Sequence, residues 1–405
     1  MKFAGPGYST GCTRLIRSLT AAFFLTVVSL AVGQTPSPNQ SNTFSAETCG
    51  RADPAYIRTA NETGGIPMFL QRSEAAKAFH LLRESTRNNV ATVFWATGTI
   101  KGKTQIFKIP VDSVTQRITF TFSGDTKGDV LNLTSPSGQE LVESAARAEI
   151  TDLSCGRIIT VTSPDAGGWH AEIRGSGRYW IEVQAQSDIY FVSAEFVKTG
   201  GRPGHEGLFR TQGQPVAGTS PMFQASLSAK PTKTTEFYSV TEQGEILQKL
   251  PLRATNSDRE FLEFVGSIDL PKVPFRVAVM GLDTNGKPYQ RFLSKLFHAE
   301  NVEVLSKPDF DQLQAGSTKR LLFTVRNTEA SRNFKITVAD AHQFVSAVEP
   351  KELNLRAGES GAVLVTLTVP VSVAEGVGDD IVFVAASLTG PPTSNSNIVH
   401  FTVSH

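Results

Sequence analysis

Apolar and polar residues alternate most clearly between residues 163 and 198, where the repeat is two residues. This is the period of a β-strand with one buried face. Gly175-Ser176-Gly177 and Ser187-Asp188 would reverse the chain between successive strands. The pattern therefore predicts an antiparallel meander of three strands, at residues 169–174, 178–185 and 189–197.

The same alternation continues on both sides of this meander and divides into three groups of short strands. Short strands at this spacing, separated by turn residues, are typical of β-sandwiches and jelly rolls. The glycine-rich stretch at residues 199–204 favours a boundary between the first two groups. We expect an all-β protein with a jelly-roll-like sandwich followed by two immunoglobulin-like (Ig-like) sandwiches, at residues 91–198, 205–298 and 301–405.

The first ninety residues have a different pattern. Basic residues precede an apolar run in residues 1–33, which end in small residues, and this predicts a cleaved secretory signal peptide. An uncleaved membrane anchor is the alternative. Residues 34–46 are polar and bear prolines, so we expect a flexible linker. Residues 47–90 have a helical pattern, with one short segment opening at Pro54 and another after Ser73.

The charge of the chain is nearly balanced, with 39 basic and 38 acidic residues. Cleavage of the leader would remove three basic residues and no acidic ones, leaving 36 basic residues against 38 acidic. Such a balance does not provide the basic surface that nucleic-acid-binding proteins need. No other segment is apolar enough to span a membrane. We therefore expect a secreted or cell-surface protein, or a periplasmic one in a Gram-negative source, whose partner is an extracellular protein or glycan.

Two cysteines, Cys49 and Cys155, remain after Cys12 is removed with the leader. An oxidising compartment would permit a disulfide between them across a very long loop. The alternative is two separately buried thiols. Two cysteines without close spacing do not form a zinc site.

Three residues of the first group are candidates for ligand binding. Strand parity places Trp180 on the face opposite Tyr179 and Ile181. An exposed ring there would suit stacking on a sugar or contact with a protein, whereas a second sheet or a neighbouring domain would bury it. Asp125 and Asp129 could supply oxygen ligands for calcium, although an exposed turn between strands explains the same residues. Apart from this calcium, we expect no cofactor.

No convincing catalytic motif is present. A Gly-x-Ser-x-Gly sequence occurs at residues 7–11, but these residues belong to the predicted leader. The seven histidines stand singly, without the spacing of a metal-binding pair. We therefore expect that the protein is not an enzyme.

Residues 109–197 resemble the β-rich module that follows the von Willebrand A domain in hemicentins and in von Willebrand factor A domain-containing protein 7. The resemblance rests on GDVLNLTSPSGQE at Gly128–Glu140, SPDAGGWHAEI from Ser163 and GSGRYWIEVQ from Gly175. In those families the module is also called galectin-binding, which implies contact mediated by glycans.

The second group is similar to the Ig-like domain that follows in these families, through ILQKLPL, PFRVAVMGLDTNG and YQR between residues 246 and 291. The third group, with FTVRN and VTLTVP, is similar to Ig-like modules of secreted bacterial proteins. Residues 56–79 resemble only the last edge of an A domain, and the metal-binding Asp-x-Ser-x-Ser of that domain does not occur.

The resemblance implies a non-catalytic extracellular protein that acts in adhesion or display. The alternative is a carbohydrate-binding accessory protein of a secreted hydrolase system. Retention of oligosaccharides that is lost on Trp180→Ala would favour the accessory protein.

Overall fold

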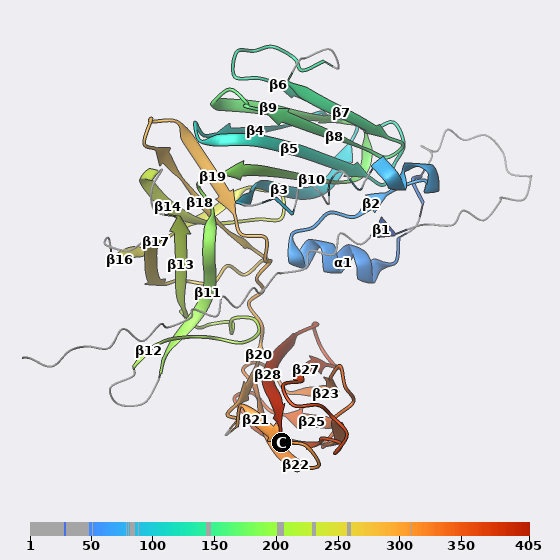
Figure 1. The fold of residues 1–405 in the computed structure, drawn as a ribbon, viewed down its shortest axis with the longest axis vertical. Coiled ribbons are helices and arrows are strands. Elements are labelled where there is room, and N and C mark those ends of the chain that lie inside the picture. Colours follow the sequence, from blue (N-terminus) through green and yellow to red (C-terminus); the bar gives the residue numbers. More distant parts are fainter. Residues whose placement is uncertain are drawn as a thin grey trace, which may run out of the picture.

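The computed structural model describes most of the chain after residue 47 as three β-sandwiches that follow one another, preceded by a short helical segment (Figure 1). The described residues are 28–29, 48–50, 52–77, 79, 81, 86–87, 89–142, 147–200, 206–228, 232–256, 261–308 and 310–405. The predicted all-β fold with a helical N-terminal segment is confirmed. The predicted leader and linker lie outside the described residues, except for residues 28–29.

The first unit contains a five-stranded sheet of order β3-β10-β5-β8-β7 and a three-stranded sheet of order β4-β9-β6. Trp169, Ala171 and Ile173 of β9 are all buried, as their alternation predicts. The eight strands are β3 (Val90–Lys101), β4 (Gln105–Val111), β5 (Thr115–Gly124), β6 (Val130–Thr134), β7 (Ala148–Leu153), β8 (Gly156–Thr162), β9 (Gly167–Arg174) and β10 (Ser176–Ser187).

The second unit contains a five-stranded sheet of order β12-β11-β13-β17-β16 and a four-stranded sheet of order β15-β14-β18-β19. Phenylalanines fill its core, where Phe196, Phe223 and Phe297 meet edge to face. The strands are β11 (Phe191–Gly200), β12 (Gly207–Arg210), β13 (Met222–Ser228), β14 (Thr232–Val240), β15 (Ile246–Leu250), β16 (Arg253–Asn256), β17 (Phe261–Ser267), β18 (Arg276–Asp283) and β19 (Pro288–Phe292).

The third unit contains a four-stranded sheet of order β20-β22-β26-β24 and a five-stranded sheet of order β21-β28-β27-β23-β25. Phe323 and Phe383 stack across the space between the sheets, with ring centroids 4.2 Å apart. The strands are β20 (Val302–Ser306), β21 (Gln312–Gln314), β22 (Thr318–Asn327), β23 (Arg332–Ala339), β24 (Val345–Glu349), β25 (Glu352–Leu355), β26 (Ser360–Thr368), β27 (Gly378–Ser387) and β28 (Ser394–Ser404).

The helical segment before the first unit starts with α1 (Pro54–Thr63). Asp53 caps this helix by accepting a hydrogen bond from the Ala55 N–H at 2.8 Å. The helix ends at Gly64, whose φ of 81° is left-handed, and a Cβ there would lie 2.6 Å from Ser294 of the second unit. The chain continues through β2 (Met68–Phe69), which pairs in parallel with β1 (Val28–Ser29), and through the 3₁₀ helix η1 (Arg72–Glu74). Part of the second predicted helix lies outside the described residues.

The predicted meander is wrong, because its three strands lie in three different sheets. β9 pairs with β4 and β6, β10 pairs with β3 and β5, and β11 pairs with β12 and β13 of the second unit. Alternation identifies a strand with one buried face but does not identify its neighbours. Gly175 and Gly177, with φ of 146° and 90°, lie where the chain crosses from one sheet to the other. The first unit therefore ends at β10, before the predicted boundary at residue 198.

The junction of the first and second units is a continuous apolar core. Val240, Ala278 and Phe292 of the second unit belong to the same buried cluster as the core of the first. Beside this core, Arg291 Nη2 lies 2.5 Å from Asp112 Oδ2, and the two side chains are 1% and 0% exposed. Arg291 also donates to the Ile189 carbonyl at 2.6 Å. The two units are therefore joined by both apolar packing and a buried ion pair.

A search of the described residues finds no helix that is long and apolar enough to cross a membrane.

Candidate functional site

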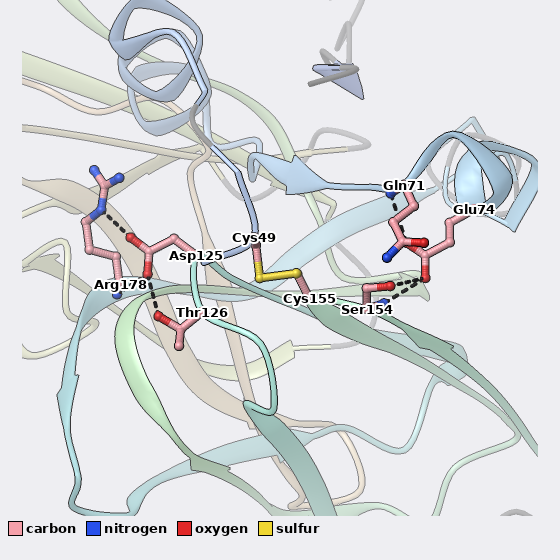
Figure 2. Close-up of a disulfide and its surroundings, with 8 residues drawn as sticks. All are labelled: Cys49, Gln71, Glu74, Asp125, Thr126, Ser154, Cys155 and Arg178. Atoms are coloured by element: carbon pink, nitrogen blue, oxygen red, sulfur yellow. Dashed lines mark hydrogen bonds and ion pairs between the residues drawn. A yellow bond between two sulfur atoms is a disulfide. The ribbon is translucent and has the colours of Figure 1, made fainter. Parts of the chain in front are cut away.

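A disulfide joins the N-terminal segment to the first unit (Figure 2). Cys49 and Cys155, which are 106 residues apart in sequence, have Cα atoms 6.0 Å apart. The Cys49 N–H donates to the Asp125 carbonyl at 2.9 Å, and the Gly124 N–H donates to the Cys155 carbonyl at 2.9 Å. The disulfide and these hydrogen bonds therefore hold residue 49 against the end of β5 and the turn before β8.

Glu74 makes a second attachment close to this disulfide, also drawn in Figure 2. Its carboxylate accepts hydrogen bonds from the Gln71 N–H at 3.0 Å and the Ser154 N–H at 2.7 Å. Burial acts to raise the pKa of Glu74, but these bonds and the nearby Lys77 charge outweigh it, so the pKa is below its ordinary value. Glu74 therefore fixes η1 to the residue that precedes Cys155.

Asp125 and Asp129, the predicted calcium ligands, lie near each other at one end of the first unit. Asp125 accepts from the Arg178 N–H at 2.8 Å and from its guanidinium at 2.9 Å. Asp129 Oδ1 accepts from the Ser176 N–H at 2.9 Å. A Cβ at Gly175 would lie 1.9 Å from the same Oδ1, so a glycine is required there.

The two carboxylates have different electrostatic environments. Burial, together with the Asp125 charge, raises the pKa of Asp129 to about 6, although the Ser176 hydrogen bond acts to lower it. The Asp125 carboxylate forms an ion pair with the Arg178 guanidinium at 2.9 Å. Among the described residues, no group of three or more His, Cys, Asp or Glu side chains is arranged to hold a metal. Calcium binding by this pair stays a prediction.

Trp180 is not an exposed binding ring, because it is only 1% exposed. Its Nε1 donates to Asn61 Oδ1 of α1 at 2.9 Å, and its ring centroid lies 5.8 Å from that of Phe69 in β2. The helical segment therefore covers the face of β10 that strand parity assigns to Trp180. The ring has a structural role there, and stacking of a ligand on it is excluded in this arrangement.

A buried cluster at the same covered face was missed by sequence reasoning. Arg276 of β18 is fully buried, with its guanidinium 4.0 Å from the ring centroid of Trp95, and it donates to the Asn61 carbonyl. Burial lowers the pKa of Arg276 to about 10, although Glu242 and Glu182 act to raise it. The alternation of β18 assigns Arg276 to a solvent-facing side, but the first unit covers that side.

Glu182 of β10 belongs to the same cluster. Burial raises the pKa of Glu182 to about 7, and hydrogen bonds from Gln184 and Thr92 together with the Arg276 charge lower it only in part. The Gln184 amide donates to Glu182 Oε1 at 3.0 Å. A carboxyl group between two units therefore changes its charge close to neutral pH.

An open cleft of about 980 Å³ lies between the second and third units, and we call it the interdomain cleft. It is lined by residues of β11, β12, the segment 211–222, β20, β22 and β28, and by Pro308 and Thr328. Three of the lining residues are large apolar side chains that remain exposed, namely Phe209 at 47%, Leu305 at 38% and Ile398 at 43%. No motif in the sequence indicates this cleft, since its walls come from three separate parts of the chain, within residues 196–222, 303–328 and 395–400.

Amide side chains hold the two walls of the interdomain cleft in place. The Gln214 N–H donates to Asn395 Oδ1 at 2.8 Å, and Asn395 Nδ2 donates to the Gln214 carbonyl at 3.0 Å. Gln214 Oε1 accepts from the His298 N–H at 3.0 Å. Glu300 Oε2 accepts from the Thr393 hydroxyl at 2.6 Å. The segment that connects the second and third units is therefore held by hydrogen bonds to both units.

Comparison with known protein families gives two matches. The model of the hemicentin galactose-binding domain-like family matches residues 92–188. The model of the VWA7 Ig-like domain matches residues 302–405. The resemblance drawn from the sequence places an Ig-like domain of this kind on the second unit, whereas the match falls on the third. Both units are two-sheet sandwiches of short alternating strands, so short motifs of turn and core residues do not distinguish them.

The chain is also similar to hemicentin-1 of Mus musculus, with 21% identity over 251 residues. The similar region covers 60% of this chain but only 4% of the mouse protein. Among solved structures, a Bacillus licheniformis lipase in propeptide form has 12% identity and a TM-score of 0.25, covering 56% of this chain and 47% of that one.

Activated Escherichia coli α-2-macroglobulin has 10% identity and a TM-score of 0.25, covering 75% of this chain and 31% of that one. Scores this low carry no argument. On the two family matches, the chain carries hemicentin-like and VWA7-like modules, namely a galactose-binding domain-like sandwich in its first unit and an Ig-like domain as its third.

Proposed function

We propose that this protein is a secreted, non-catalytic interaction protein that works in extracellular or cell-surface adhesion. The observation that carries the proposal is the presence of two hemicentin-type and VWA7-type modules in one chain. Modules of this kind are extracellular and adhesion-type. The Cys49–Cys155 disulfide supports the same compartment, because disulfides persist in oxidising surroundings.

The arrangement of the units supports a role in presentation. The first two units share one core and a buried ion pair, so they form a single stiff body. The third unit is held to this body by hydrogen bonds and leaves an open cleft beside the connection. A stiff body with a lateral cleft suits a protein that holds a partner at a fixed position.

The direct test is capture of extracellular and cell-surface material by the immobilised mature chain, starting at residue 34. Three parallel arms would contain buffer, a calcium chelator and competing sugars. Specific capture that resists the chelator and the sugars is the expected result. Absence of any specific capture would contradict the adhesion function, and turnover of a panel of ester, peptide and glycoside substrates would contradict the non-catalytic assignment.

Glycan binding is the second candidate function, favoured by the match of the first unit to a galactose-binding domain-like family. In this case the sugar arm would abolish capture, and the chain would bind galactose-terminated oligosaccharides on a glycan array. Trp180→Ala is not a suitable probe of such a site, because the ring is buried under α1.

A further inference from the structure

We propose that the interdomain cleft binds an extended acidic segment of a partner protein, which pairs with the hairpin formed by β11 and β12. This inference rests on the proposed adhesion function and specifies the chemistry of the partner.

The hairpin of β11 and β12 provides backbone groups for such pairing. β13 pairs with β11 only as far as Val197, whereas β12 pairs with β11 from Val197 to Gly200. The hairpin therefore extends beyond its sheet (Figure 1), and β12 is an edge strand of that sheet. An edge that projects in this way is a template for the addition of one more strand.

The opposite wall of the cleft is not available for the same kind of pairing. β20 is also an edge strand, but Asn395 Nδ2 donates to the Val302 carbonyl at 2.9 Å and Asn397 Nδ2 donates to the Val304 carbonyl at 3.2 Å. These side chains occupy the acceptors that an added strand would use. Strand addition is therefore directed to the hairpin, and β20 and β28 act as the wall that receives side chains.

The exposed apolar side chains of the cleft would bind a segment that has an apolar residue at every second position. Phe209 lies on the hairpin, and Leu305 and Ile398 lie on the third unit. All three side chains remain more than one third exposed although they line the same cleft. An extended segment that pairs with the hairpin would cover them with alternate side chains, and burial of apolar surface would then stabilise the complex.

The charges of the cleft favour an acidic segment. Among its described lining residues, the basic side chains are Lys198, Arg210 and Arg326, whereas the only acidic one is Glu303. Arg326 lies 3.8 Å from Glu303, and Arg210 lies 3.2 Å from Glu195 of β11. Lys198 lies on the projecting part of the hairpin and is exposed. Lys198 takes part in neither of these two pairs, so a carboxylate between the apolar residues of the segment would complement its charge.

The test uses the full mature chain and an array of end-capped nine-residue peptides that alternate apolar residues with glutamate. A matched array has lysine in place of glutamate. We expect the strongest signals from the glutamate array, and dissociation constants from fluorescence anisotropy at least about tenfold lower than for the lysine counterparts. N-methylation of alternate backbone amides in the best peptide should abolish its binding, because strand addition needs those hydrogen bonds.

Two pairs of variants locate the binding site. Lys198→Glu and Ile398→Asp should each weaken the best glutamate peptide by about tenfold or more. Lys335→Glu and Val371→Asp should leave it unchanged, because these exposed residues of the third unit do not line the cleft.

The inference is overturned by equal binding to both arrays, by no binding to the glutamate array, by tolerance of N-methylation, or by loss of binding in all four variants alike. Failure of the peptides together with continued capture of extracellular material would overturn this inference alone. Loss of that capture as well would overturn the adhesion function.

Discussion

The two junctions of this chain are built from different interactions. Between the first and second units, a single apolar core continues across the boundary, and the buried Arg291–Asp112 ion pair lies beside it. Between the second and third units, hydrogen bonds of amide, hydroxyl and carboxylate groups link the chain segments, and an open cleft remains.

This difference means that the first junction contributes more to the stability of the fold, whereas the second can change its geometry more easily. A junction that buries charges is strongly coupled to folding, because loss of one partner leaves an unpaired charge inside the protein. A junction held by hydrogen bonds beside an open cleft, without a buried ion pair, contributes less free energy and can change geometry without unfolding either side. We therefore expect the first two units to unfold together and the third to unfold independently.

The strongest test of this comparison is Arg291→Met. The substitution leaves Asp112 buried without its partner, so we expect the free energy of unfolding of the first two units to fall by about 3–5 kcal/mol. Urea unfolding monitored by tryptophan fluorescence measures this change. Arg210→Met, which breaks the exposed pair with Glu195, should cost no more than about 1 kcal/mol. Similar losses in the two variants would show that the buried pair does not hold the junction.

Removal of the disulfide should cause the next largest loss of stability. The loss should be confined to the first two units and should not affect the third. Cys49→Ser together with Cys155→Ser should lower the stability of the first two units by about 2–5 kcal/mol, because the closed loop is long. Calorimetry should show the transition of the third unit at an unchanged temperature. A shift of both transitions would mean that the units are coupled across the interdomain cleft.

Glu182 should make the stability of the first junction depend on pH. Its pKa is raised from 4.5 to about 7, so the folded state retains a proton that the unfolded state has already released. The contribution of Glu182 to the free energy of unfolding should therefore be largest below pH 4.5 and should fall as the pH rises to about 7. Above this pH it should stay constant. The total loss should be no more than about 3 kcal/mol.

Glu182→Gln is the matched variant, because it keeps the size of the side chain and removes its charge. Relative to the wild type, the variant should gain stability as the pH rises from 5 to 7. Chemical unfolding at each pH measures the difference. Parallel pH profiles for the two proteins would indicate that Glu182 is ionised throughout this range and that Arg276 stabilises it in the folded state.

Asn395→Ala should have the smallest effect on stability and a clear effect on geometry. Loss of its hydrogen bonds to Gln214 and to the Val302 carbonyl should cost about 1–2 kcal/mol. Small-angle X-ray scattering should show a broader distribution of distances between the second and third units. Asn354→Ala, on β25 of the third unit, is the control and should leave the scattering unchanged. Unaltered scattering in Asn395→Ala would show that other contacts fix the third unit.

The sequence predicted the type of fold well because alternation reports the buried face of each strand. Trp169, Ala171 and Ile173 are buried as expected, and Pro54 begins a helix. Alternation could not predict which strands are neighbours, since pairing depends on where the chain crosses between sheets. For this reason the alternation predicts that residues 189–197 belong to the first unit, whereas β11 lies in a sheet of the second.

The candidate site was less predictable, because alternation along a strand does not show whether another element covers its second face. Trp180 and Arg276 both lie on such positions and are both buried, one under α1 and the other against the first unit. Asn61 contacts both of them, yet a single asparagine in a helix gives no signal of this in the sequence. The interdomain cleft is formed only when separate units come together, so no local motif marks it.

The contacts of Asn61 also have a consequence for the order of events during synthesis. Its carbonyl accepts from Arg276, which lies 215 residues later in the chain. At ordinary elongation rates, roughly 10–40 s separate the appearance of these two residues. Throughout this interval the Asn61 carbonyl of the nascent helix lacks the Arg276 side chain that donates to it. The face of the first unit that the second unit covers is therefore exposed to solvent during this time.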